Sequence, residues 1–281
     1  MITTLPDADF SSSRAPRARP LRYGFDVTGL KGLWLFEDGD IDQPHVGPFQ
    51  DYSGLGSDLT LYTGRTAPIR RSYGLEVADV DGLILESAIS SGLAEFTMLA
   101  AVKPRLPGDE AGVYQTIFGS TDTPLPPADT GRHDHQTFPV INFDGTSPAA
   151  SAEWAVFDYS GDVFGSVRPV VDGGSAGGSL NDAVVLDFAV SASADTARIG
   201  THLSTPRTFT SQALGDYYSQ SRSGVLTFGA WPEGFSRTVA SPQAELYGFA
   251  LYDRYLDAEA LTYARAAMTA RIEARGVTLA T

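Results

Sequence analysis

Five acidic side chains in the first quarter of the chain have the residue types and spacing of a site for a hard metal ion. They lie in two glycine-containing segments, 37–40 and 51–58. Carboxylate oxygens around tight glycine turns are ligands that Ca²⁺ prefers, so the segments predict a structural calcium site. Turn formation without a metal is the alternative, because Asp and Gly are ordinary turn residues. The acids are Glu37, Asp38, Asp40, Asp51 and Asp58.

Several aromatic side chains are candidates for binding a sugar, because a sugar ring stacks on an exposed aromatic face while a few polar groups orient it. Trp231 is followed by Pro232 at the end of an expected strand, which favours a place at a loop rim. For each candidate, packing in the core or at its rim is the alternative. Trp34 lies inside an apolar run and is assigned to the core. The candidates are Trp231, Tyr217, Tyr218, Tyr114 and Trp154.

Common catalytic motifs are missing. The sequence contains neither Gly-x-Ser-x-Gly nor a P-loop, and it has no cysteine to act as a nucleophile. His133 and His135 flank Asp134, but two His at i and i+2 do not define a tetrahedral zinc site without a third ligand. We therefore expect these histidines to lie in a solvated loop. We also expect that the protein is not an enzyme.

Composition excludes further classes. The chain has 281 residues and a formal net charge of −14, whereas nucleic-acid binding needs clustered Lys and Arg. The absence of cysteine excludes disulfides and thiolate metal sites. No apolar run is long enough for membrane insertion, and the N-terminus has acids where a signal peptide needs an apolar core. We expect a protein made in a cytoplasm without a signal peptide.

Residues 1–24 are predicted to form a separate segment, in which arginines alternate with prolines. Proline fixes φ and removes backbone donors, so the segment is expected to be extended. It is either a loose tail or an arm that docks on an acidic surface of its own or a neighbouring subunit, which arginine pairing would favour. The arginines of the arm are Arg14, Arg17, Arg19 and Arg22.

Residues 25–281 are predicted to form one all-β domain. Short apolar segments with turn residues between them follow one another closely and no βαβ pattern occurs, which is typical of an antiparallel two-sheet β-sandwich. The strand EFTMLAAVKP is expected to pair with YQTIFGS across the loop RLPGDEAG.

A single helix is expected over 257–275. Asp257 is placed as its N-cap, Leu256 and Leu261 as a staple, and Gly276 as the C′ residue. Its apolar stripe is Leu261, Ala264, Met268 and Ile272.

The closing segment LYGFALYDRYLDAEALTYARAAMTARIEARGV resembles the end of laminin-G-like, concanavalin A-like jelly-roll domains. GLWLFEDGD and DYSGLGSDLTL resemble the first strand and first turn of that family, and EFTMLAAVKP with QTIFGS resembles its central pair. The resemblance covers about residues 30–276 and implies that the two acidic loops lie near one another. The chain departs from the family at Gly248, where an acid that helps hold calcium is usual and the nearest acid is Glu245. It also carries long insertions at 120–136 and 204–223, where specificity could reside.

Related jelly rolls include glycan hydrolases and lyases, but the paired-glutamate strand of the hydrolases and the Arg-rich and Gln-x-His strands of the lyases are absent. The resemblance therefore implies a non-catalytic, lectin-like protein that contacts a host surface polysaccharide. A bacteriophage virion, released by lysis, would bring such a domain out of the cell without a signal peptide. We expect a tail-fibre, spike or capsid-decoration protein, a homo-oligomer joined to other virion subunits through its arm. The alternatives are a purely structural decoration protein and a glycan-degrading enzyme.

Overall fold

In the residues that it describes, the computed structural model consists of β-strands, one turn of 3-10 helix (η2, Ala192–Ala194) and one α-helix (α2, Ala258–Glu273). No helix in the described part of the chain is long and apolar enough to cross a bilayer. The described residues are 21–64, 66–77, 84–105, 113–116, 118–120, 140–143, 152–157, 163–171, 182–210, 224–229 and 243–280.

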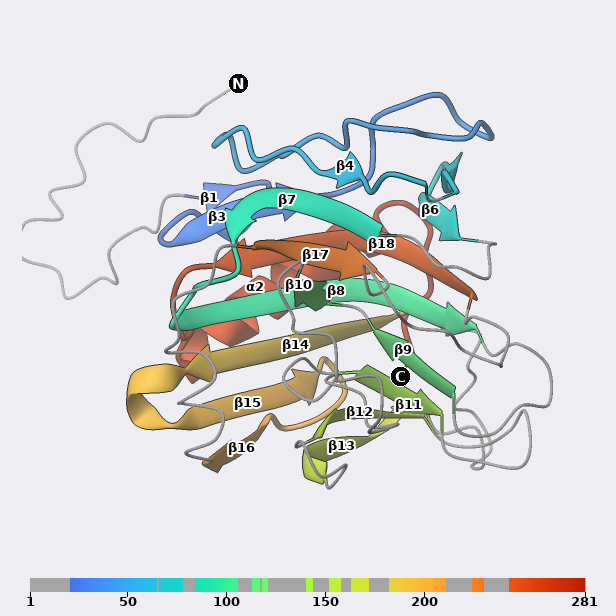
Figure 1. The fold of residues 1–281 in the computed structure, drawn as a ribbon. Coiled ribbons are helices and arrows are strands. Elements are labelled where there is room, and N and C mark those ends of the chain that lie inside the picture. The colour runs from blue at the N-terminus through green and yellow to red at the C-terminus, as the bar shows by residue number, and fades with distance from the viewer. Residues whose placement is uncertain are drawn as a thin grey trace, which may run out of the picture.

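Eight of the described strands form one antiparallel sheet in the order β16-β15-β14-β8-β18-β6-β5, with β3 also paired to β18 (Figure 1). Because β3 is near the start of the body and β18 near its end, this pairing closes the domain with two segments distant in sequence. The strands are β3 (Leu30–Trp34), β5 (Ile69–Arg71), β6 (Gly74–Val77), β8 (Glu95–Arg105), β14 (Val184–Ser191), β15 (Thr196–Thr201), β16 (Arg207–Thr210) and β18 (Gln243–Tyr252).

The strands that oppose the large sheet form two antiparallel four-stranded sheets, β10-β17-β7-β4 and β13-β12-β11-β9. Figure 1 shows β7, β17 and β10 crossing one face of the large sheet, and β13 lies against β15 and β16. The predicted two-layer antiparallel sandwich is therefore confirmed. The strands are β4 (Thr60–Leu61), β7 (Ile84–Ser90), β9 (Val113–Thr116), β10 (Phe118–Ser120), β11 (Val140–Phe143), β12 (Ala152–Phe157), β13 (Val163–Val171) and β17 (Val225–Gly229).

One predicted pairing is wrong. The segment YQTIFGS does not pair with EFTMLAAVKP: β9 pairs with β11 and β10 pairs with β17, whereas β8 pairs with β14 and β18. The reason is geometric, because β14 and β18 occupy both edges of β8 along most of its length. The chain that leaves β8 therefore continues in the opposing layer.

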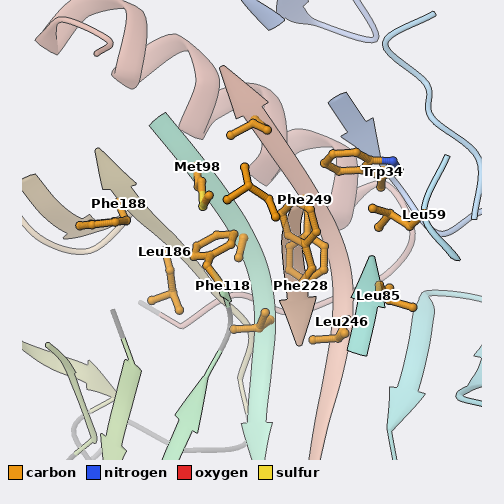
Figure 2. Close-up of a cluster of buried hydrophobic side chains, with 14 of the residues drawn as sticks. Trp34, Leu59, Leu85, Met98, Phe118, Leu186, Phe188, Phe228, Leu246 and Phe249 are labelled. Carbon is orange, nitrogen blue, oxygen red and sulfur yellow. The ribbon is translucent and has the colours of Figure 1, made fainter. Parts of the chain in front are cut away.

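Apolar side chains on both faces of the large sheet produce two cores. The sandwich core lies between the layers, where Phe228 of β17 stacks on Phe249 of β18 at a centroid distance of 4.8 Å (Figure 2). Trp34 is fully buried beside them, as predicted, and its indole nitrogen donates to the carbonyl of Ser57. The largest members of the sandwich core include Trp34, Phe36, Phe49, Phe96, Phe118, Phe188, Phe228 and Phe249.

The helix-side core lies on the other face, beneath α2. In β8 the side chains alternate, so that Met98 and Ala100 enter the sandwich core while Leu99 and Ala101 face the helix. A β-bulge between Leu246 and Gly248 interrupts the alternation of β18, so that both Tyr247 and Gly248 face the helix side. Members of the helix-side core are Phe25, Leu30, Leu33, Leu35, Leu99, Ala101, Val185, Tyr247, Ala250, Tyr252, Leu256, Leu261, Ala264, Met268, Ile272 and Leu279.

The ends of α2 form as their local sequence predicts. The carboxylate of Asp257 accepts a hydrogen bond from the amide of Ala260 at 2.8 Å, as an N-cap does. Gly276 has φ +80°, and the amides of Gly276 and Val277 donate to Glu273 and Ile272, which is a Schellman motif with Gly276 at C′. The four predicted stripe residues and Leu256 are all buried, so the expected helix over 257–275 is confirmed within a residue or two.

A buried ion pair also ties α2 to the sheet. Arg265 donates from Nε to a carboxylate oxygen of Asp187 in β14 at 2.8 Å, and its Nη2 donates to the same oxygen. Asp187 is 0% exposed. A Cβ on Gly200, the partner of Asp187 in β15, would lie 2.1 Å from Nη2 of Arg265, so the glycine makes room for the guanidinium.

A short hairpin precedes the body. Strands β1 (Leu21–Arg22) and β2 (Phe25–Asp26) pair across the turn Tyr23-Gly24. Phe25 is buried in the helix-side core and β2 lies against α2, so the end of the predicted N-terminal segment is attached to the domain. Arg14, Arg17 and Arg19 lie outside the described residues, and the docking arm stays a prediction.

Candidate functional site

The two predicted acidic loops lie side by side, as the family resemblance implied. The backbone amide of Gln50 donates to Asp38 at 3.3 Å, and Asp51 forms an isolated bridge with Trp34. The buried carboxylate of Asp51 accepts from the amides of Leu33, Ser53 and Ser57 and from the hydroxyl of Ser53, and its own amide donates to Asp58. Hydrogen bonds of this kind, from nearby backbone amides and a serine hydroxyl to an aspartate carboxylate, are typical of aspartates that form turns.

The other three predicted calcium ligands have separate surroundings. Glu37 pairs with Arg271 and Arg275 of the helix end, Asp38 pairs with His45 at 2.9 Å, and Asp40 is exposed. In the ranges that the structure describes, no three His, Asp or Glu side chains are grouped to hold a metal ion. Calcium at these loops stays a prediction.

Gly248, the position where the family resemblance leads one to expect an acid, faces α2. A Cβ there would lie 3.1 Å from the sulfur of Met268 and 3.2 Å from the carbonyl oxygen of Trp34. The close approach of helix and strand therefore excludes a large side chain. The nearby Glu245 is buried and accepts from the hydroxyl of Tyr247 at 2.8 Å.

Most of the predicted sugar-binding aromatics lie where the structure gives no test. Trp231, Tyr217 and Tyr218 are outside the described residues, as are His133 and His135. Tyr114 lies in β9 and Trp154 in β12, but their side chains are not described. Their roles stay predictions.

A different aromatic, Tyr23, has the exposure that sugar stacking requires. It occupies the first position of the β1–β2 turn and is 47% exposed. Tyr23 and Gly24 have φ values of +52° and +88°. Positive φ at both central positions is the pattern of a type I′ turn, which normally carries Asn-Gly. A bulky side chain there costs on the order of 1–3 kcal/mol, and such strain concentrates at functional sites.

Tyr52 and Arg271 lie against this exposed ring, and Arg22 precedes it in the chain. The Tyr52 ring meets it edge-on at a centroid distance of 5.5 Å, and the guanidinium of Arg271 lies 5.5 Å from its centre. The exposed Arg22 rests on Gly54, where an added Cβ would lie 2.3 Å from its Nη1. We call the group formed by Arg22, Tyr23, Glu37, Tyr52 and Arg271 the Tyr23 platform.

An ion pair joins two charged members of the platform, Glu37 and Arg271. Glu37 accepts from Nε and Nη2 of Arg271 and lies 3.9 Å from Arg275. Arg275 donates to the carbonyls of Leu35 and Tyr247. Burial lowers the pKa of Arg275 to about 10, with Glu37 opposing the shift, so this arginine still carries its charge at neutral pH.

The polar groups of the platform are mainly hydrogen-bond donors. Burial raises the pKa of Tyr52, and the negative charges of Asp38 and Glu37 raise it further, so its phenol keeps its proton at neutral pH. The oxygens of Glu37 are held by arginine. What the platform presents is an exposed aromatic ring flanked by guanidinium and phenol groups, which suits a ring-shaped ligand with oxygen acceptors.

Sequence reasoning missed this site, since it assigned Tyr23 to an extended segment. The available signal was the dipeptide Tyr23-Gly24 directly before a buried Phe25, because X-Gly between two short extended segments is a hairpin signal. The contribution of Arg271, more than 200 residues away, has no local signal.

Neither the family models nor the curated proteins contain a match to this chain. Solved structures share its fold at low identity. The botulinum neurotoxin serotype D binding domain matches with TM-score 0.54 and 9% identity over 87% of this chain and 52% of that one. The serotype D ligand binding domain in complex with N-acetylneuraminic acid matches with TM-score 0.52 and 10% identity over 87% and 51%.

Trypanosoma rangeli sialidase in complex with sialic acid matches with TM-score 0.50 and 11% identity, over 86% of this chain and 33% of the sialidase. The chain thus spans about half the length of the neurotoxin domains and a third of the enzyme. At these identities the likeness establishes a shared β-sandwich fold.

Proposed function

We propose that this protein is a non-catalytic glycan-binding β-sandwich and that the Tyr23 platform is its sugar site. The observation that carries the proposal is an exposed tyrosine held on a strained turn, with the guanidinium of Arg271 against its ring. A strained conformation persists where the surrounding structure imposes it, and stacking on a sugar is a role that an exposed ring can serve. Two structural neighbours, a neurotoxin ligand binding domain in complex with N-acetylneuraminic acid and a sialidase in complex with sialic acid, support the same class of ligand.

The hydrogen-bonding character of the platform favours an acidic sugar. Arg271 uses Nε and Nη2 on Glu37, and a guanidinium carries five N–H donors in all. Both oxygens of Glu37 already accept from Arg271. Donors therefore outnumber free acceptors, which matches a sugar that carries a carboxylate. One open site of this kind is expected to bind with a Kd on the order of 1 mM, so useful affinity requires an array of copies.

The experiment is a titration of the full chain with sialic acid and with lactose, followed by NMR or calorimetry. The variant Tyr23→Asn places the residue preferred at this turn position, so it removes the ring and relieves the backbone. We expect loss of sialic acid binding with thermal stability unchanged or raised by up to about 1 kcal/mol, because relief of strain offsets the lost ring contacts.

Tyr263→Asn is the matched control, since it removes another exposed tyrosine, which lies on α2. Tyr263 is eight residues from Arg271 on α2, or about 12 Å, beyond the reach of a monosaccharide. Unchanged affinity in Tyr23→Asn would overturn the platform. Binding lost in Trp231→Ala or Tyr217→Ala but not in Tyr23→Asn would keep glycan binding and move the site to those residues. A protein that binds no sugar would favour the purely structural alternative.

Two narrower proposals accompany this one. We propose that the protein does not cleave the glycan it binds, and a reducing-end assay on host capsule or lipopolysaccharide that released oligosaccharide would contradict this. We also propose that it is displayed on a bacteriophage virion through residues 1–24, an argument that rests on the Arg/Pro-rich sequence. Immunogold labelling of purified particles tests the location, and deletion of residues 1–20, which spares the β1–β2 hairpin and the platform, tests the attachment.

A further inference from the structure

The segment that follows α2 returns to the large sheet and is held there by main-chain pairing. The amide of Ala183 donates to the carbonyl of Thr278 at 3.0 Å, and the amide of Ala280 donates to the carbonyl of Ala183 at 2.9 Å. Ala183 and Leu279 form a parallel bridge, and Leu279 is buried in the helix-side core. Residues 277–280 therefore close one end of that core.

The ring of His202 links this segment to β14. Its Nδ1 accepts from the amide of Val185 at 3.1 Å, and its Nε2 lies 3.0 Å from the carbonyl oxygen of Ala280. A backbone amide can only donate and a carbonyl can only accept, so Nδ1 must be bare and Nε2 must carry the hydrogen. Both contacts exist together only while the imidazole is neutral and in this one tautomer.

The surroundings of His202 disfavour a second proton. Burial is the main cause that lowers its pKa below the ordinary 6.5. The hydrogen bonds with Ala280 and Val185 oppose the lowering of the pKa, as does the negative charge of Glu273, whereas the positive charge of Arg265 adds to it. The nearest acid of β14, Asp187, is already engaged by Arg265.

We propose that His202 is an acid-operated clasp that releases residues 277–280 from the sheet. A proton on Nδ1 would face the N–H of Val185, so the ring must swing away and give up the carbonyl of Ala280. Leu279 then leaves the helix-side core, and the main-chain groups of Ala183 lose their partners. The device is independent of the Tyr23 platform, because none of its residues belongs to that group.

The sign of the pH dependence follows from linkage. A group whose pKa is lower in the docked state binds more protons in the released state, so the clasp contributes its full stability above about pH 6.5 and loses it as pH falls toward the docked-state pKa. Within that window the ratio of released to docked segment rises about tenfold for each pH unit.

The test is NMR of the full chain from pH 7.5 to 5, which follows the His202 ring and the amides of Val185 and Ala280. We expect His202 to titrate below pH 6.5, and the two amides to lose hydrogen-exchange protection in step with it, after correction for intrinsic exchange. In His202→Asn the side-chain oxygen can still accept from Val185 but cannot titrate, so protection should no longer depend on pH. His45→Asn is the control and should keep the wild-type transition.

Three results would overturn the clasp. The first is a His202 ring that titrates at or above pH 6.5. The second is release that persists in His202→Asn with the same pH dependence. The third is a segment that stays protected in the wild type after the ring has titrated. The wild-type titration tests the clasp even if the variant folds poorly. Sialic acid binding at neutral pH tests the platform separately, and it should be equal in wild type and His202→Asn.

Discussion

Substitution of Arg265 by Met should destabilise the protein strongly, because it removes the main partner of a fully buried carboxylate. Met keeps a side chain of comparable length and takes away both hydrogen bonds to Asp187. Arg198 is the remaining positive charge that lowers the pKa of that acid. Breaking a buried ion pair by removing one partner typically costs about 3–5 kcal/mol, and we expect a loss of this size.

The loss should also depend on pH. Burial raises the pKa of Asp187 in the wild type although Arg265 opposes the shift. Without Arg265 the folded-state pKa rises further, and a group of this kind contributes stability that is present below its unfolded pKa and is lost as pH rises through the folded one. The deficit of Arg265→Met relative to wild type should therefore be largest at neutral pH and shrink as the pH falls toward 4.

Thermal and urea unfolding at pH 7 and pH 4.5 would measure the effect. A loss of 1 kcal/mol lowers Tm by about 2–4 °C in a large domain, so a drop of roughly 6–20 °C is expected at neutral pH. In the double variant Asp187→Asn/Arg265→Met the buried charge is absent, so this variant should be more stable than Arg265→Met alone.

Arg71→Met is the control, because Arg71 forms a partly exposed pair with Asp42 and Glu76 and should change Tm far less. A wild-type Tm in Arg265→Met would refute the reasoning. So would a double variant less stable than the single one, since the packing of the pair and not its charge would then matter.

Two further substitutions test the local structure. Asp257→Ala removes the cap hydrogen bond to Ala260 and should cost about 1 kcal/mol in urea unfolding, whereas Glu259→Gln leaves that bond and should cost less; equal effects would contradict the cap. Gly32→Ala places a Cβ 2.2 Å from the indole of Trp34 and should cost roughly 1–3 kcal/mol. Tryptophan fluorescence would show whether the indole moves, and an unchanged spectrum and Tm would contradict the close packing.

The sequence predicted those parts of the fold whose cause is local. Asp257 caps α2 because its side chain lies next to the amides it can satisfy, and the apolar stripe of α2 follows from helical spacing. The run around Trp34 is buried on both faces of the sheet, as a continuous apolar strand should be. The turn role proposed for the residues around Asp51 also has a local cause, because aspartate and glycine are ordinary turn formers, and their hydrogen bonds are those of such turns.

Strand pairing was harder to predict, and the error around β8 shows why. Apolar alternation tells which face a residue occupies, but it is the same whichever neighbour a strand pairs with. The alternation in EFTMLAAVKP is therefore compatible with pairing to the next segment in the sequence and equally with pairing to β14 and β18. The choice depends on how two layers fill a common core, which no single segment encodes.

The amino-acid sequence by itself determined the class of fold, the capped helix on its outer face and the general expectation of binding rather than chemistry. The tertiary structure alone decided where the candidate site lies, because Tyr23, Tyr52 and Arg271 come from a hairpin, a loop and the last helix. The same holds for the contacts of Asp187 with Arg265 and of His202 with Ala280, each 78 residues apart. Local propensity acts over a few residues, whereas contacts of this kind form only when the packed sheet brings distant segments together.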